Sequence, residues 1–149
     1  MNLLINIIVW LVLFVPTVLE AALDYREHKK REERAKKDPN YKPKGDNHVG
    51  DLVMRGALMV VMGIIAHFID PQYMWWQGSI LSLGIFIMFF DFIMGYLLTK
   101  NPLYLGKTSQ TDRKLVGLSG FATIFCRGIL FASAVTTYYQ LEKVIGYVY

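Results

Sequence analysis

Residues 80–98 read ILSLGIFIMFFDFIMGYLL, and this stretch decides the fold class. Asp91 is the only residue in it that carries a charge at neutral pH. At a rise of about 1.5 Å per residue, a helix of this length matches the roughly 30 Å hydrocarbon core of a bilayer. Soluble domains rarely need a helix that is apolar on every side. The stretch therefore predicts a membrane protein in which Asp91 is the residue most expensive to bury.

Three further segments are apolar enough to cross a bilayer. Of the 149 residues, 54% are hydrophobic and only 19% are charged, which is typical of a small polytopic protein with little soluble mass. We predict a single membrane domain, an all-α integral membrane bundle of four transmembrane helices. The expected spans cover residues 3–23, 51–69, 80–98 and 115–138. The expected connectors cover residues 24–50, 70–79 and 99–114.

The first span is expected to continue beyond the membrane as a charged helix. Residues 24–37 read DYREHKKREERAKK. An acid precedes a base by four residues, the order that stabilises a helix, in three pairs: Glu27/Arg31, Glu32/Lys36 and Glu33/Lys37. No Lys or Arg precedes Arg26, so we expect a retained span and not a cleaved signal peptide.

The distribution of basic residues predicts the orientation. Thirteen of the 16 Lys and Arg residues fall in connectors 24–50 and 99–114, whereas the opposite side has only Lys143. Connectors rich in Lys and Arg face the cytoplasm. We therefore expect both long connectors inside, connector 70–79 outside, and both termini outside, in a plasma (inner) membrane. The basic charge favours anionic lipid as a partner; nucleic acid is not expected, since no binding motif for it is present.

Each expected span brings one charge to the cytoplasmic half of the membrane, at depths of roughly 5–17 Å by the helical rise. The four residues are Glu20, Arg55, Asp91 and Arg127. Charges in hydrocarbon usually pair inside the bundle. We predict that Asp91 pairs with Arg127 or Arg55, and that Glu20 pairs with the remaining arginine. Such pairs fix the helix register; alternatively, they line a polar cavity that opens to the cytoplasm.

A second set has the chemistry of a divalent metal site near the same boundary. Its members offer oxygen and nitrogen ligands: Asp24, His28, His48 and Asp51. Asp24 and His28 are four residues apart and share a helix face. The simpler interpretation is a solvated group of charges, so no cofactor is expected and a divalent metal is the alternative.

Other chemistry finds little support. Cys126 is the only cysteine, which excludes an internal disulfide and a cysteine-based metal site. Three histidines are too few for the histidine-rich di-iron pattern of membrane desaturases. Two small-residue surfaces, Gly56 with Gly63 and Gly128 with Ala132, suit close helix packing or a homo-oligomer.

Three functional hypotheses follow, and an enzyme is the less favoured class. The first is a structural or accessory protein that packs in the bilayer and presents its basic arm to a protein partner or to anionic lipid. The second is a small transporter or channel lined by the four buried charges. The third is a metal-dependent membrane enzyme that uses the second set of residues.

Overall fold

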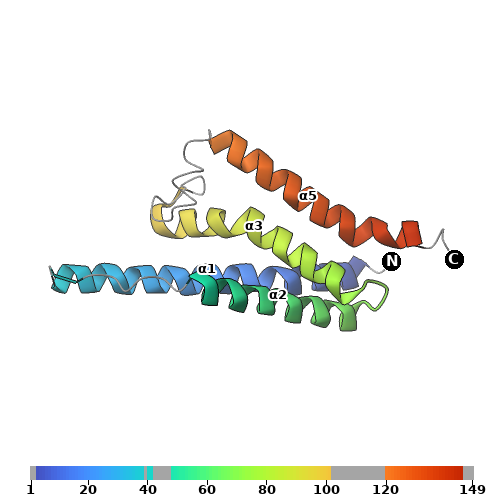
Figure 1. Cartoon of the computed structure of the whole chain (residues 1–149), viewed down its shortest axis with the longest axis horizontal. Helices are drawn as coiled ribbons and strands as arrows, with labels where there is room; N and C mark the ends of the chain where they lie inside the picture. The colour runs from blue at the N-terminus through green and yellow to red at the C-terminus, as the bar shows by residue number, and fades with distance from the viewer. Residues whose placement is uncertain (1–2, 39, 42–47, 102–119, 146–149) are drawn as a thin grey trace.

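The computed structural model describes residues 3–38, 40–41, 48–101 and 120–145. Four α-helices account for nearly all of them: α1 (Leu3–Lys37), α2 (His48–Ile69), α3 (Trp75–Thr99) and α5 (Gly120–Ile145) (Figure 1). No strand occurs in these ranges, which confirms the all-α class.

Three helices are long and apolar enough to cross a membrane, namely α1, the Gly50–Ile69 part of α2, and α3. They identify the chain as a membrane protein. Within the described residues α5 is not among them, so the expected fourth span at 115–138 lacks this support. Arg127 and several hydroxyl side chains make α5 less apolar than α3, and residues 115–119 lie outside the described part of the chain.

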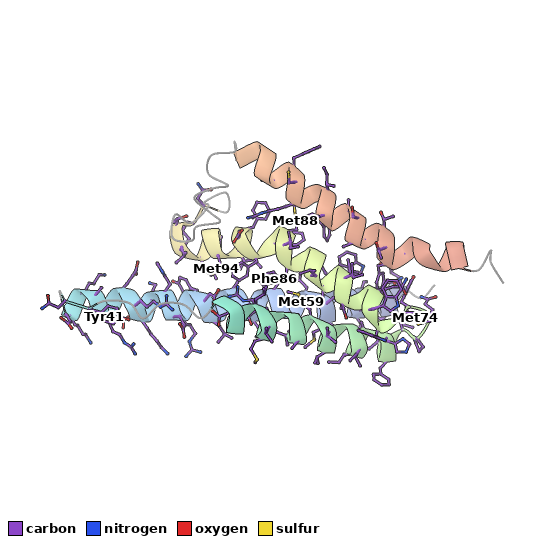
Figure 2. All side chains as sticks on the ribbon, viewed as in Figure 1. Tyr41, Met59, Met74, Phe86, Met88 and Met94 are labelled. Carbon is purple, nitrogen blue, oxygen red and sulfur yellow. The ribbon has the colours of Figure 1, made fainter. Side chains whose placement is uncertain are left out.

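α1 runs without a break through Pro16 to Lys37, so the charged segment continues the apolar helix, as its acid–base spacing predicts. We call residues 24–37 the arm. Most of the arm extends past the ends of α2 and α3, and its side chains project on several sides (Figures 1 and 2). Pro16 has no N–H to donate to the carbonyl four residues back. One residue further on, the Leu13 carbonyl accepts a hydrogen bond from Ser82 Oγ of α3 at 3.2 Å.

α3 lies at the centre of the arrangement and packs against α1, α2 and α5. Glycines permit two of these close approaches. A Cβ on Gly63 of α2 would lie 2.6 Å from the backbone nitrogen of Ser79, and a Cβ on Gly84 would lie 2.6 Å from the Ala134 methyl carbon of α5. A Cβ on Gly56 would meet nothing within 4 Å. Of the small residues singled out in the sequence of α2, only Gly63 therefore lies at a helix crossing.

The core gathers at the end of the bundle where α2 turns into α3. Its buried members are Val9, Leu13, Ala66, Tyr73, Leu81, Ile85 and Tyr138. The rings of Tyr73 and Tyr138 stack with centroids 4.3 Å apart, and Trp10 Nε1 donates a hydrogen bond to Tyr139 Oη at 2.7 Å. We call this the aromatic end.

α3 begins at Trp75, so the expected outer connector at 70–79 is too long. The Met74 N–H donates to Gln77 Oε1 at 2.6 Å, which satisfies a backbone donor at the start of the helix. The amide of Gln77 is buried, and its Nε2 donates to the carbonyls of Thr137 and Tyr138 at 3.3 and 3.4 Å. The connector is shorter than expected because this polar residue both caps α3 and joins it to α5.

Candidate functional site

Arg55 of α2 holds two carboxylates of α1 at the end of the bundle opposite the aromatic end. Its Nε donates to Glu20 Oε2 at 3.2 Å, and its Nη2 donates to Asp24 Oδ2 at 2.8 Å. Glu20 and Asp24 are one helical turn apart, so both reach the same guanidinium. The exposed fractions of the three side chains are 26% for Arg55, 19% for Glu20 and 38% for Asp24. Hydrogen bonds between ionised groups are stronger than neutral ones, so this contact ties α1 firmly to α2.

α3 completes the group through two aromatic rings. Arg55 Cζ lies 5.7 Å from the ring centre of Phe86 and 5.4 Å from that of Phe90. The two rings stack on each other with centroids 4.6 Å apart. A guanidinium is attracted to the face of an aromatic ring at such distances. We call Arg55, Glu20, Asp24, Phe86 and Phe90 the Arg55 cluster; it joins three helices where the apolar part of α1 ends.

Acids outnumber bases around Arg55. Burial raises the pKa of the Asp24 carboxyl above its ordinary value, and the neighbouring Glu20 and Asp51 raise it further. The Arg55 guanidinium acts in the opposite direction. Asp24 lies one residue beyond the expected first span, at the point where the arm begins.

A second ion pair joins α3 to α5. Arg127 Nη2 contacts Asp91 Oδ2, and the Arg127 side chain is only 13% exposed whereas that of Asp91 is 35% exposed. Of the two arginines considered for Asp91 in the sequence, the structure brings Arg127 to it and gives Arg55 to Glu20. In the described ranges no ion pair links these two groups. We call the part of the bundle that contains them the charged end.

Of the candidate metal ligands that the structure describes, Asp24 and His28 have other partners, and Asp51 lies near enough to Asp24 to raise its pKa. Asp24 is hydrogen bonded to Arg55, and His28 Nε2 lies 3.4 Å from Glu32 Oε1 on the arm. Asp51 is exposed, and the side chain of His48 lies outside the described part of the chain. Among the residues that the structure describes, no group of three or more His, Cys, Asp and Glu could hold a metal ion. A divalent metal at this position stays a hypothesis.

The arm has two different faces. Salt bridges join Glu27 to Arg31 at 3.3 Å and His28 to Glu32 at 3.4 Å, so Glu32 contacts His28 and not the expected Lys36. At 100° per residue, the Glu27–Arg31 pair lies on the side of α1 that carries Glu20 and Asp24, and the His28–Glu32 pair lies at the edge of that side.

The rest of the arm's circumference, an arc of about 160° with Arg34 at the edge nearest Glu20, holds six exposed basic residues. They are Arg26, Lys29, Lys30, Arg34, Lys36 and Lys37, which we call the basic stripe. Glu33 is the acidic residue on this face. Within the described residues none of the six forms a salt bridge, so their charge is available to an external anion.

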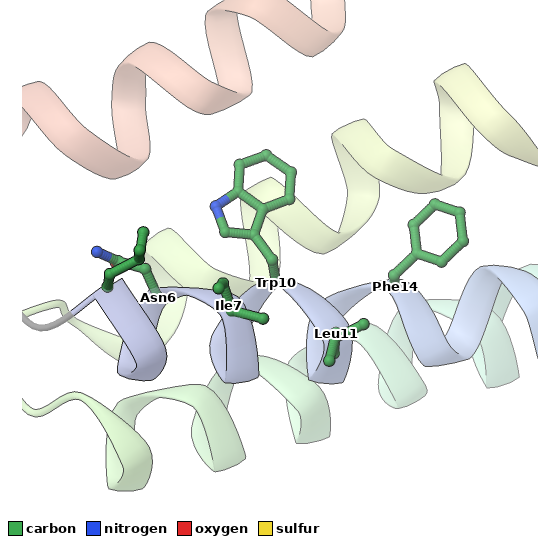
Figure 3. A pocket seen from close by; sticks show the side chains of 6 residues that line it. Asn6, Ile7, Trp10, Leu11 and Phe14 are labelled. Carbon is green, nitrogen blue, oxygen red and sulfur yellow. The ribbon is translucent and has the colours of Figure 1, made fainter.

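An apolar groove of about 460 Å³ lies near the start of α1 (Figure 3). It is lined by Leu3, Asn6, Ile7, Trp10, Leu11 and Phe14. Trp10 points from α1 toward α5 in this view. None of Glu20, Arg55, Asp91 and Arg127 lines this groove, and its surface suits hydrocarbon.

Comparisons with protein-family models, with curated proteins and with solved structures found no match for this chain.

Sequence reasoning missed several participants in these contacts. Asp24 was considered only as a solvated charge or a metal ligand, and no role was assigned to Phe86 or Phe90, although all three contact Arg55. A usable signal was present: two acids four residues apart on one span and two aromatics four residues apart on another form matching faces for a single arginine.

Proposed function

We propose that the chain is a small polytopic membrane protein with a structural or accessory role, in which the bundle holds a basic helical arm at the membrane surface. The observation that carries this proposal is the Arg55 cluster. It joins α1 to α2 and α3 at the point where α1 changes from apolar to charged, and α1 continues from there without a break. An arm held in this way presents its charges at a constant position to a protein partner or to anionic lipid.

In this proposal α5 is the fourth crossing. Its contact with α3 and the neutralisation of Arg127 by Asp91 support this, because a paired charge costs less in hydrocarbon than an unpaired one. The basic connectors then face the cytoplasm and both termini face out.

Spin–spin distance measurements test the arm. Labels at Ala35→Cys on the arm and Met54→Cys on α2, in a Cys126→Ser background, should give a narrow distance distribution in the otherwise unchanged protein. Arg55→Gln should broaden it, because the guanidinium that joins the arm to the bundle is lost. Arg34→Gln, which changes an exposed basic residue of the arm itself, serves as the matched control and should leave the distribution narrow. A broad distribution before any change at Arg55 would refute the proposal.

Cysteine accessibility tests the orientation. In the Cys126→Ser background, a membrane-impermeant thiol reagent added to intact cells should modify Gln72→Cys in the α2–α3 connector but not Ala35→Cys. Modification of Tyr149→Cys from the same side should follow if α5 crosses the membrane. Labelling of Ala35→Cys from outside would reverse the proposed orientation.

A further inference from the structure

We infer that the part of the basic stripe nearest the bundle, formed by Arg26, Lys29 and Lys30, binds the headgroups of anionic lipids that surround α1. The inference rests on the proposed function, because it requires the arm to continue α1 beyond the membrane.

The basic stripe continues the face of α1 that contacts lipid. The buried side of α1 is marked by Val9, Leu13 and Pro16, and the helical angle places Glu20 and Asp24 on that same side. The exposed apolar side chains lie opposite, at Ile8, Leu11, Val15, Val18, Leu19 and Leu23. Arg26 and Lys30 follow Leu19 and Leu23 on this exposed face. Since α1 is one unbroken helix, Arg26, Lys29 and Lys30 project over the surrounding lipid and not over the other helices.

The helical rise limits which basic residues reach the headgroups. Arg26 lies about 4.5 Å beyond Leu23 along the helix, and Lys30 about 10 Å. The polar headgroup layer is about 5–8 Å thick on each side of the hydrocarbon. Lys and Arg side chains extend back several ångströms along a helix, so all three proximal residues reach phosphate groups.

The distal residues are out of range. Arg34, Lys36 and Lys37 lie roughly 17–21 Å beyond Leu23. Their distance from the headgroup layer is about one screening length or more at 0.1 M salt, so their attraction to it is weak. A soluble partner, by contrast, has equal access to both halves of the stripe. The two halves therefore distinguish a lipid from a protein ligand.

Lipid selectivity of the full-length protein in bilayers tests the inference. Electron paramagnetic resonance of spin-labelled phosphatidylglycerol and phosphatidylcholine measures how strongly each lipid associates with the protein surface. The unchanged protein should prefer phosphatidylglycerol. Substituting Arg26, Lys29 and Lys30 together with Gln should lower the preference by up to about fivefold for each residue. The matched control, Arg34, Lys36 and Lys37 together substituted with Gln, removes the same amount of charge from the arm and should change the preference less than twofold.

An unchanged preference in the proximal variant would overturn the inference. Equal losses in both variants would also overturn it, because the distal residues would then attract the lipid as strongly as the proximal ones. Raising the salt concentration tests the unchanged protein without any substitution, because salt screens the attraction between basic residues and headgroups. A preference for phosphatidylglycerol that does not fall with salt would also contradict the inference. The spin–spin distance measurement keeps the two proposals apart. A rigid arm without lipid preference refutes this inference and leaves the proposed function standing, whereas a broad distance distribution refutes the proposed function itself.

Discussion

The two ends of the bundle hold their helices together by different means. At the aromatic end, Tyr73 stacks on Tyr138 and neutral hydrogen bonds run from Trp10 and Gln77 to α5. At the charged end, Arg55 and Arg127 link helices through carboxylates and aromatic faces. When one partner of a neutral hydrogen bond is removed, the other is left unsatisfied, at about 1–3 kcal/mol if it is buried. An ion pair also leaves a charge in a medium that does not solvate it. The charged end should therefore be more sensitive to the loss of a single group.

The largest effect is expected from Arg127→Gln. This change leaves Asp91 without its cation, at a cost of about 3 kcal/mol. The free energy of unfolding in bicelles should fall accordingly, and Asp91→Asn together with Arg127→Gln should recover much of the loss. The transporter hypothesis expects a different result for Asp91→Asn alone: flux lost at unchanged stability. Equal destabilisation in Arg127→Gln and in the double variant would contradict this expectation, because it would show that the unpaired carboxylate of Asp91 adds no cost.

A smaller loss in the free energy of unfolding is expected from Gly63→Ala, which tests packing between α2 and α3. The added methyl group would overlap the backbone of α3 at Ser79, so the helices must move apart, at about 1–3 kcal/mol. Gly56→Ala is the matched control on the same helix, because a Cβ there meets nothing. It should be neutral or stabilising by up to about 1 kcal/mol, since Ala favours the helix. Similar thermal unfolding midpoints for both variants would argue against the close crossing.

Trp10→Phe should lower the free energy of unfolding by about 1 kcal/mol, because it removes the hydrogen bond to Tyr139 but keeps an aromatic ring beside Phe131. Tyr139→Phe should cost a similar amount, and the double variant should cost no more than either single one. Strictly additive losses in such a cycle would mean that the two groups do not interact. The cycle gives the energy of one neutral hydrogen bond at the aromatic end.

The smallest effect concerns the titration of Asp24. Its pKa lies above the ordinary value in the fold, so the folded chain binds this proton more tightly than the unfolded chain. The resulting stabilisation is present below the ordinary pKa and is lost as the pH rises through the raised one. Arg55→Gln should raise the pKa of Asp24 further, because the guanidinium lowers it. A ¹³C NMR titration of the carboxyl measures this, and a fall in its pKa would contradict the observed pairing.

The sequence alone was sufficient for the parts of the fold that depend on long apolar runs. The three spans in α1, α2 and α3 follow from hydrophobic length, and the helical arm follows from its acid–base spacing. The start of α3 was misplaced because Gln77 is polar in the sequence, although its amide is used inside the protein. Depth along a helix likewise did not decide between Arg55 and Arg127 as the partner of Asp91. That choice depends on which helices are neighbours, and hydropathy carries no information on it.

The order of the two ion pairs along the chain has a consequence for membrane insertion. Arg55 follows Glu20 by 35 residues and belongs to the next helix along the chain. Both carboxylates of α1 have therefore already been synthesised when Arg55 leaves the ribosome. Asp91 of α3, by contrast, is synthesised before its partner Arg127, which belongs to α5. A nascent chain that has released α3 but not α5 therefore contains a complete Arg55 cluster beside an aspartate that still lacks its cation. We expect this intermediate to be the species that quality-control proteases remove, and pulse-chase lifetimes of a chain truncated before α5 would measure it.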